Sequence, residues 1–345
     1  MIQTVAQLEA LVGPIPEAAH LKVIDHLDGH AQRWLAASPL AFAGFSSGPD
    51  VRATLVGGAP GFAQAVRGGL RLPRAALDDP ALPRPGQGCG WLFLVPGLGE
   101  TLRINGRVIE AGEQEVAVAV DECYMHCAKA ILRSDFWRPD AAAATPDTTR
   151  PTTSEAADGH AGWLRQAESS RFMGWATADA RGRTDLSPKG DPAGVLVQVV
   201  DGDLCFADRP GNHRMDSVRN LLEQPRAAAV LLVPGNCRVA VVSGVARIVT
   251  DPHVRARFAV QGREPRLVTR LAVSDFVWRT SAALVRAAPW TDGRPPPDLD
   301  AAAAFAAHVK LNWARGWQAA LARGMVSIPG LMRKGLEQDY KRNLY

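Results

Sequence analysis

Thr184-Asp185-Leu186-Ser187-Pro188-Lys189-Gly190-Asp191-Pro192 is the stretch on which the fold assignment rests, and Asp208-Arg209-Pro210-Gly211-Asn212-His213-Arg214-Met215-Asp216-Ser217 follows it closely. The first stretch predicts a strand that runs into a Gly/Pro turn carrying Lys189. The second predicts a Pro-Gly turn before a helix that starts near Asp216. Lys189 and Arg214 would then lie beside turn N–H groups and a helix N-terminus, which together can bind a phosphate. Two ordinary surface turns with solvated charges would produce the same pattern.

The composition is typical of a globular protein with sizeable cores, since 47% of the 345 residues are hydrophobic and 21% are charged. The net charge of +4 is small and the basic residues are scattered, so we expect no nucleic-acid partner. No apolar run approaches the ~20 residues of a membrane span, and residues 1–9 do not resemble a signal peptide. Five cysteines without a zinc-type pair indicate reduced thiols. We therefore expect a cytoplasmic protein without a membrane partner.

Residues 5–37 have apolar positions at helical spacing, and Gly13-Pro14-Ile15-Pro16 divides them into two predicted helices. His20, His26 and His30 fall in the second helix. His26 and His30 are four residues apart and could share a face suited to a metal, but histidines in such helices are more often surface or capping residues. We assign no metal site here.

After Ser38 the pattern changes to short β-rich runs separated by glycine and proline, which indicates a barrel or sandwich. The runs are 41–47, 51–56, 62–72, 91–95, 101–109 and 114–120. A short helical segment is predicted at 123–137, and 138–160 has a linker composition. The β-rich pattern restarts at Arg171 and continues to about Trp290. The prediction is a mainly β, α+β chain, divided into N-terminal helices with a first barrel (1–140), a linker (141–165), a second barrel (166–292) and a helical tail (293–345).

The second β-rich region repeats the first. Three matches occur in the same order: Leu94–Gly97 with Leu232–Gly235, Asn105-Gly106 with Ser243-Gly244, and 122–137 with 275–290. The last match pairs Arg133 with Arg286 and Trp137 with Trp290. The chain is therefore predicted to contain two tandem copies of one split-barrel-like module.

The two copies carry different polar residues. Lys189 corresponds to Val56, and Pro80 and Pro83 interrupt the region that matches the helix after Asp216. Conversely, His126, Cys127 and Lys129 of the first copy correspond to Arg279, Thr280 and Ala282. Two copies packed about a pseudo-twofold axis would form two clefts, and only the one combining 184–217 with 123–137 would hold all the polar groups. Independent drift of two unneeded sites is the alternative. Because the pair is already internal, we expect a monomer.

At these residues the chain resembles the pyridoxamine 5'-phosphate oxidase-like superfamily of flavin-binding split β-barrels. The resemblance covers nearly the whole chain and includes the N-terminal helices and, less specifically, 339–345. Its motifs are Ala176–Asp179, Gly182-Arg183, Ser187–Pro192 and Asp208–Ser217 in the second half, and Leu92–Val108 and His126–Trp137 in the first half.

The resemblance implies a flavin, FMN or alternatively FAD, held at the interface of two barrels. Family members place two such sites in a homodimer, whereas the split motif set implies one composite site in this chain. The cofactor-binding residues that the resemblance implies are Ser187, Lys189, Gly190, Asp191, Arg209, Asn212, Arg214 and Ser217 from the second half, with His126, Lys129, Arg133 and Trp137 from the first half. A structural hydrogen bond between the modules is the alternative role of His126.

The leading functional hypothesis is a flavin-dependent oxidoreductase that acts on a small-molecule or electron-donor substrate. No residue stands out as a catalytic acid or base. One alternative is a flavocytochrome oxidase, in which Phe276, Val277 and Trp278 of the second cleft would contact haem. Its candidate axial ligands are His20, His160, His213, His253 and His308. A flavin carrier or sensor without catalysis is a further alternative.

Overall fold

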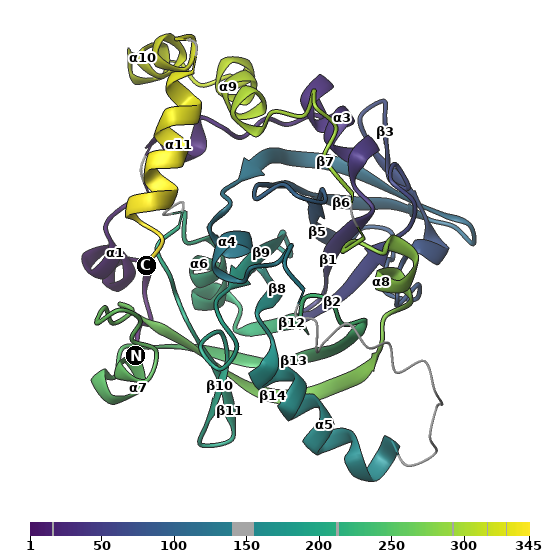
Figure 1. The fold of residues 1–345 in the computed structure, drawn as a ribbon, viewed down its shortest axis with the longest axis vertical. Helices are drawn as coiled ribbons and strands as arrows, with labels where there is room; N and C mark the ends of the chain where they lie inside the picture. The colour runs from purple at the N-terminus through teal and green to yellow at the C-terminus, as the bar shows by residue number, and fades with distance from the viewer. Residues whose placement is uncertain (16, 140–154, 212–213, 292, 316, 329) are drawn as a thin grey trace.

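The computed structural model describes residues 1–345 except 16, 140–154, 212–213, 292, 316 and 329. The described residues contain two seven-stranded antiparallel sheets, one in each half of the chain (Figure 1). The first module consists of β1 (Leu40–Ser47), β2 (Asp50–Gly57), β3 (Gln64–Val66), β4 (Gly69–Pro73), β5 (Gly88–Leu94), β6 (Thr101–Ala111) and β7 (Glu115–His126). The second module consists of β8 (Phe172–Ala178), β9 (Thr184–Gly190), β10 (Gln198–Val200), β11 (Asp203–Ala207), β12 (Arg226–Leu232), β13 (Arg238–Val249) and β14 (Val268–Thr280).

The two sheets have the same topology. Their strand orders are β2-β1-β5-β6-β7-β4-β3 and β9-β8-β12-β13-β14-β11-β10. The irregularities match as well, because the β6–β7 register shifts between Asn105 and Gly106 and the β13–β14 register shifts between Ser243 and Gly244. The sequence alignment pairs these same positions. The internal repeat and the α+β fold of two tandem split barrels are therefore confirmed.

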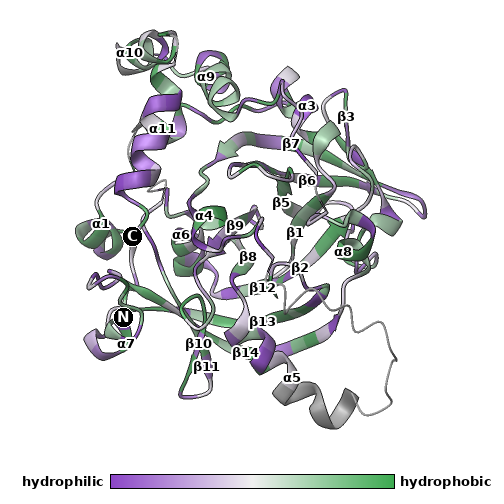
Figure 2. Ribbon diagram, in the orientation of Figure 1, coloured by the Kyte–Doolittle hydropathy of each residue, from purple (hydrophilic) through white to green (hydrophobic). Residues whose placement is uncertain are grey.

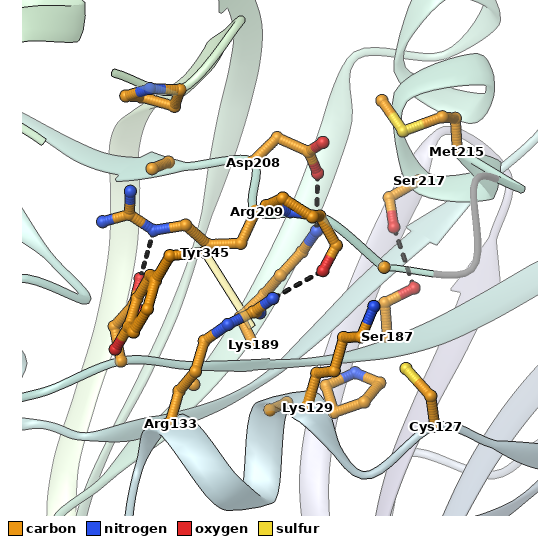
Figure 3. Close-up of a pocket in the computed structure, with 18 of the residues that line it drawn as sticks. Cys127, Lys129, Arg133, Ser187, Lys189, Asp208, Arg209, Met215, Ser217 and Tyr345 are labelled. Atoms are coloured by element: carbon orange, nitrogen blue, oxygen red, sulfur yellow. Dashed lines mark hydrogen bonds and ion pairs between the residues drawn. The ribbon is translucent and has the colours of Figure 1, made fainter. Parts of the chain in front are cut away.

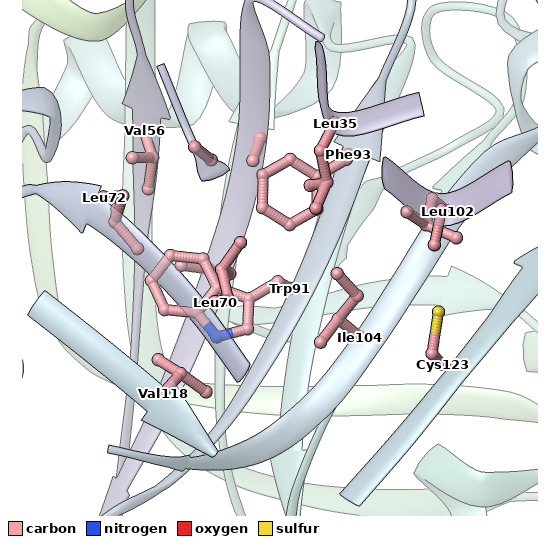
Figure 4. Close-up of a cluster of buried hydrophobic side chains, with 14 of the residues drawn as sticks. Leu35, Val56, Leu70, Leu72, Trp91, Phe93, Leu102, Ile104, Val118 and Cys123 are labelled. Atoms are coloured by element: carbon pink, nitrogen blue, oxygen red, sulfur yellow. The ribbon is translucent and has the colours of Figure 1, made fainter. Parts of the chain in front are cut away.

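Each module has its own apolar core, and a third cluster joins the modules. Trp91 and Phe93 lie in the core of the first module (Figure 4), and Trp175 and Phe206 lie in that of the second. The joining cluster combines residues of both halves, including Phe42, Leu55, Leu92, Phe172, Val230 and Leu284. Burial of this shared surface fixes the two sheets against each other and creates the clefts at their edges.

Strands β1 and β8 meet at the pseudo-twofold axis. Phe42 and Gly174 are equivalent positions. Phe42 lies two residues after the partner of Leu94 in β1, and Gly174 lies two residues after the partner of Leu232 in β8. They also touch, because a Cβ on Gly174 would lie 2.5 Å from the Phe42 ring. One copy thus supplies a ring at the axis and the other supplies the space for it.

Helices flank the sheets and carry much of the polar surface, and Figure 2 shows that α11 is largely hydrophilic. They are α1 (Val5–Val12), α2 (Glu17–His20), α3 (Gly29–Ala37), α4 (Lys129–Arg133), α5 (Glu155–Ser169), α6 (Asp216–Glu223), α7 (Pro252–Ala256), α8 (Ala282–Ala287), α9 (Ala301–Leu311), α10 (Trp317–Val326) and α11 (Leu331–Arg342), with a 3-10 turn at Arg74–Ala76. Within the described residues, no helix combines the length and the apolar character that crossing a membrane requires.

The prediction of one continuous second helix before residue 37 is wrong, because two separate helices lie there. Helix α2 ends at His20, and α3 begins at Gly29 because Asp28 caps it by accepting a hydrogen bond from the backbone N–H of Ala31. His26 therefore lies outside a helix and contacts Asp25. In the described part of the chain, no group of three or more histidine, cysteine or acidic residues could hold a metal ion.

Three boundaries also differ from the predictions. Lys189 lies inside β9, opposite Met173 of β8, rather than in a turn, because the ladder continues to Gly190. Only Lys129–Arg133 of the predicted helical segment 123–137 forms a helix, since β7 extends to His126. Helix α5 begins at Glu155, inside the predicted linker, while 140–154 lies outside the described residues.

Candidate functional site

A cavity of about 330 Å³ lies where the two modules meet (Figure 3). Strand β7 and helix α4 supply one wall, while β9, β11 and the start of α6 supply the other. Among the predicted site residues, the cavity is lined by His126, Lys129 and Arg133 from the first module and by Ser187, Lys189, Gly190, Asp191, Arg209 and Ser217 from the second. Tertiary structure thus brings together two segments that lie about 60 residues apart in the sequence.

The lining is positively charged. It includes seven lysine and arginine residues (Arg103, Lys129, Arg133, Lys189, Arg209, Arg263 and Arg266) against four acidic residues (Asp191, Asp208, Asp216 and Glu264). An excess of cationic groups on partly enclosed walls favours an anionic ligand.

Arg209 has a buried side chain in this lining, and one of its guanidinium N–H groups has no acceptor among the described residues. Its Nε donates to Asp191 Oδ2 at 2.7 Å, and its Nη1 donates to the carbonyl oxygen of Phe258 at 2.8 Å. Nη2 is buried and has no hydrogen-bond partner among the described residues. A buried guanidinium N–H without an acceptor is costly, so an anionic ligand oxygen would satisfy it.

Lys189 and two serines lie on the walls of the same cleft. The Nζ of Lys189 is 3.2 Å from Asp208 Oδ1, and both side chains are about one-fifth exposed. The hydroxyl of Ser217 in the first turn of α6 is 2.9 Å from that of Ser187 in β9. Met215 adopts a left-handed conformation before α6 and provides no side-chain cap, so ligand oxygens could bind the first N–H groups of this helix.

A buried charge network lies under the cavity and links the modules. Arg103 of β6 pairs with Asp185 of β9 and donates its Nε to Asn105 Oδ1 at 3.2 Å. Asn220 of α6 donates to the other oxygen of Asp185 at 2.7 Å. The network holds the Arg103 guanidinium at the cavity in one orientation.

Tyr124 organises a second group of cations. Lys22, Arg103 and Arg214 lie over its ring at 5.1, 5.5 and 4.9 Å from the centroid. Burial lowers the pKa of Lys22 to about 8, and its Nζ donates to the Met125 carbonyl oxygen at 3.1 Å.

His126 is neutral in this environment. Burial lowers its pKa well below the ordinary value, and the nearby charges of Lys22 and Arg103 lower it further. A neutral imidazole on the cavity wall offers one donor and one acceptor nitrogen.

The segment after α11 contributes to the cavity lining. The Tyr345 ring lies between the guanidinium groups of Arg133 and Arg209, with centroid distances of 5.6 and 5.7 Å. The Nε of Arg133 donates to the Leu344 carbonyl oxygen at 2.6 Å, and Lys129 pairs with Asp339 at 2.8 Å. Figure 3 shows Tyr345 beside Arg209.

Two of the predicted cofactor residues lie outside the cavity lining. Arg214 is not among the cavity lining, and its Nε donates to Asp216 Oδ2 at 2.9 Å while its ring contact is Tyr124. Trp137 is also outside the lining and donates its indole N–H to the Leu98 carbonyl oxygen. Asn212 lies outside the described residues.

The equivalent cleft on the other side of the pseudo-axis is filled by the protein itself. Arg286 donates to the carbonyl oxygens of Gly57 and Ala76 at 3.0 and 2.8 Å. Asp78 accepts hydrogen bonds from the Ser281 hydroxyl and the backbone N–H of Ala283. The expectation that Phe276, Val277 and Trp278 line this cleft holds for neither Phe276 nor Trp278, because the Trp163 ring packs on Phe276 and Gly162 lies against the Trp278 ring, both from α5. Val277 is 44% exposed.

The described haem-ligand candidates are also away from the cavity. His20 ends α2, His253 lies in α7, and neither is among the lining residues. His308 is fully buried with its Nε2 3.2 Å from Asp28 Oδ1. The side chain of His160 and the whole of His213 lie outside the described residues.

Sequence reasoning missed several lining residues. Arg103 lies in a family motif, but the sequence prediction gives it no role. An arginine that is buried within a strand indicates a fixed functional contact. Arg263, Arg266 and Tyr345 come from a loop and from the last segment of the sequence. Their position depends on long-range packing that no local pattern reveals.

Comparison with known proteins identifies the second module. Residues 163–280, which include β8 to β14, match the family model described as pyridoxamine 5'-phosphate oxidase. No curated protein matches the chain.

Several solved structures resemble parts of the chain. HupZ from Group A Streptococcus is 14% identical and the match covers 35% of this chain and 94% of that one, with a TM-score of 0.29. General Stress Protein 26 from Bacillus anthracis is 11% identical, with coverages of 35% and 93% and a TM-score of 0.29. A pyridoxamine 5'-phosphate oxidase-related, FMN-binding protein from Nostoc punctiforme is 14% identical, with coverages of 37% and 83% and a TM-score of 0.24.

Proposed function

Because residues 163–280 form a split-barrel domain of the pyridoxamine 5'-phosphate oxidase-like family, we propose that this protein is a flavin-dependent oxidoreductase. The flavin, FMN in preference to FAD, would bind in the cavity between the modules. One chain would bind one flavin, since the equivalent cleft is closed by Arg286 and Asp78.

The observation that carries the proposal is the free donor of Arg209 in a cationic cleft. Arg209 Nη2 is buried without a partner, and Lys189, Ser187 and Ser217 lie on the same walls. These groups could bind the oxygens of a phosphate, because guanidinium, ammonium and hydroxyl donors are the usual partners of phosphate. The phosphate of the flavin would therefore lie at the second module.

The other residues of the cavity fit the ring end of a flavin. The flavin would supply the electron-transfer chemistry, and the protein would supply binding, orientation and electrostatics. Asp185 orients the Arg103 guanidinium at the cavity, where its N–H donors could bind an anionic ring edge. Neutral His126 can donate or accept a hydrogen bond there, and Tyr345 adds an aromatic ring to the lining.

The first test is flavin binding by the purified full chain. FMN is titrated into the protein and flavin fluorescence and absorption are measured, then a reduced nicotinamide and other small reductants are supplied as electron donors. One FMN per chain, with oxidation of at least one donor, is the expected result. Binding without turnover would leave only the carrier or sensor alternative, a Soret band would favour the flavocytochrome, and no binding of FMN or FAD would refute the proposal.

A further inference from the structure

Helix α10 presents an unusual apolar face to solvent. We define the α10 face as Trp317, Leu321 and Met325, which recur every four residues in α10, together with the exposed Trp313 and Ile328 in the segments that flank the helix. Trp313 and Trp317 are 80% and 74% exposed. Seven of the sixteen exposed large apolar side chains in the described part of the chain lie between 311 and 331, so the exposure is concentrated here. Figure 1 shows α10 at one end of the molecule, away from the sheets.

The opposite side of the same helix already forms the contacts that anchor it. Ala319, Ala322 and Val326 pack with Leu21, Phe305 and Val309 in a small apolar cluster. Arg323 donates to the carbonyl oxygens of Asn312 and Ala314, both at 2.6 Å, which holds the segment before α10. Since α10 is apolar on both sides and only one side is packed, the outer side is available for a second apolar medium.

The chain segment that carries this face is basic. No aspartate or glutamate occurs between Asp300 and Glu337, whereas this segment contains five basic residues: Lys310, Arg315, Arg323, Arg333 and Lys334. Lys310, Arg315, Arg333 and Lys334 are exposed, and Arg333 is the one of these four that pairs with an acidic residue among those described, Asp300 at 2.6 Å. Exposed tryptophans, an apolar helix face and flanking basic residues without acidic ones are the features of helices that lie at an anionic membrane surface.

We propose that the α10 face docks the protein peripherally on an anionic lipid bilayer, with α10 parallel to the membrane plane. A second copy of the chain fits less well, because a symmetric contact would bring the same basic side chains together. The sequence predicts no membrane-spanning segment, and α10 would lie in the membrane interface without crossing it. This docking is independent of the flavin site, since none of these residues lines the cavity.

The test is co-sedimentation of the full chain with vesicles of phosphatidylcholine alone or mixed with phosphatidylglycerol. We expect binding to the anionic vesicles, little binding to the neutral ones, and a decrease as salt is raised. A double variant, Trp317→Ser with Leu321→Ser, is expected to bind these vesicles at least roughly tenfold more weakly than the wild type. Lys310→Gln and Arg315→Gln should each weaken binding about fivefold.

The matched control is Ile109→Ser, which removes an apolar side chain of β6 that is 61% exposed and should leave vesicle binding unchanged. All of these side chains are exposed, so the variants should fold, which circular dichroism checks. Absence of binding to anionic vesicles would overturn the proposal. So would equal binding by the double variant, or a dimer in analytical ultracentrifugation that the double variant dissociates.

Discussion

Arg133 and Arg286 show how one position can serve two purposes. They are equivalent in the repeat, and each guanidinium donates to backbone carbonyl oxygens. Arg286 binds Gly57 and Ala76 within the closed cleft. Arg133 binds Pro210 and Leu344 at the edge of the open cavity and also contacts the Tyr345 ring. The same side chain closes one cleft and borders the other because the opposing residues have changed.

Lys189 provides the most direct test of the phosphate assignment. Lys189→Met retains most of the aliphatic stem and removes the ammonium group, whereas Arg209→Ala would leave buried Asp191 without its partner. Loss of one charge-assisted hydrogen bond of about 1.5–3 kcal/mol should weaken FMN binding by about 10- to 100-fold, measured by fluorescence titration. Arg71→Ala, which removes a surface pair with Glu115, is the control and should bind normally. Wild-type affinity in Lys189→Met would remove this residue from the site.

Asp28 gives a prediction for pH dependence. Burial alone would raise its pKa, but the hydrogen bonds from His308 and the backbone N–H of Ala31 outweigh burial and lower that pKa to about 2. A depressed carboxyl pKa stabilises the fold above the unfolded-state value, and this contribution is lost as the pH falls from about 4 to 2.

Asp28→Asn should retain the cap of α3 and lose the charge. We expect the free energy of unfolding to fall by about 1–2 kcal/mol at neutral pH and the acid dependence between pH 4 and 2 to become shallower. Thermal unfolding at several pH values measures both effects. Asp50→Asn, at an exposed surface pair, is the control, and an unchanged acid profile for Asp28→Asn would contradict the assignment.

At the scale of elements, the strand–helix contacts beside the two clefts obey the pseudo-twofold symmetry. Gly190 of β9 lies against α4, and a Cβ there would be 2.0 Å from the Ala130 carbonyl oxygen. Gly57 of β2 lies against α8, where the corresponding distance to the Ala283 carbonyl oxygen is 2.3 Å. Both glycines are needed because backbone approaches backbone too closely for any side chain.

These two glycines form a matched pair of variants. Gly190→Ala and Gly57→Ala should each force a helix away from a strand and lower the free energy of unfolding by about 1–3 kcal/mol. Only Gly190→Ala should also weaken FMN binding, because α4 carries Lys129 and Arg133 at the cavity. Denaturant unfolding and flavin titration of both variants measure the two effects separately. Equal flavin binding by the two would show that the position of α4 does not matter to the site.

At the scale of the whole molecule, the shared apolar cluster replaces the subunit interface of a dimer. Phe42 meets Gly174 at the axis, an arrangement that two identical subunits could not form because each would present the same residue. Fusion of the modules therefore permits unequal residues at the axis and unequal clefts beside it.

The whole-molecule prediction is one flavin in a monomeric chain. Analytical ultracentrifugation without lipid should show a monomer, and FMN titration should saturate at one per chain. Trp290 donates its indole N–H to the Phe136 carbonyl oxygen at 2.9 Å and belongs to segment 275–290, which lies at the closed cleft. Trp290→Ala should therefore lower stability and leave the flavin stoichiometry unchanged. Loss of flavin from this variant, or two flavins per wild-type chain, would contradict the single-site arrangement.

The sequence by itself determined the repeat, the β-rich class and the two segments that meet at the cavity. It could do so because strand alternation, turn residues and the match of Asn105-Gly106 with Ser243-Gly244 are local features that survive in linear order. Tertiary structure alone decided which side chains face the cavity. Arg214 turns toward Tyr124 and Asp216, whereas Arg103, Arg263 and Tyr345 reach the cavity from distant segments. The direction of a side chain depends on long-range packing and on the free-energy cost of burying a charge without a partner. Neither can be predicted from the spacing of residues along the chain.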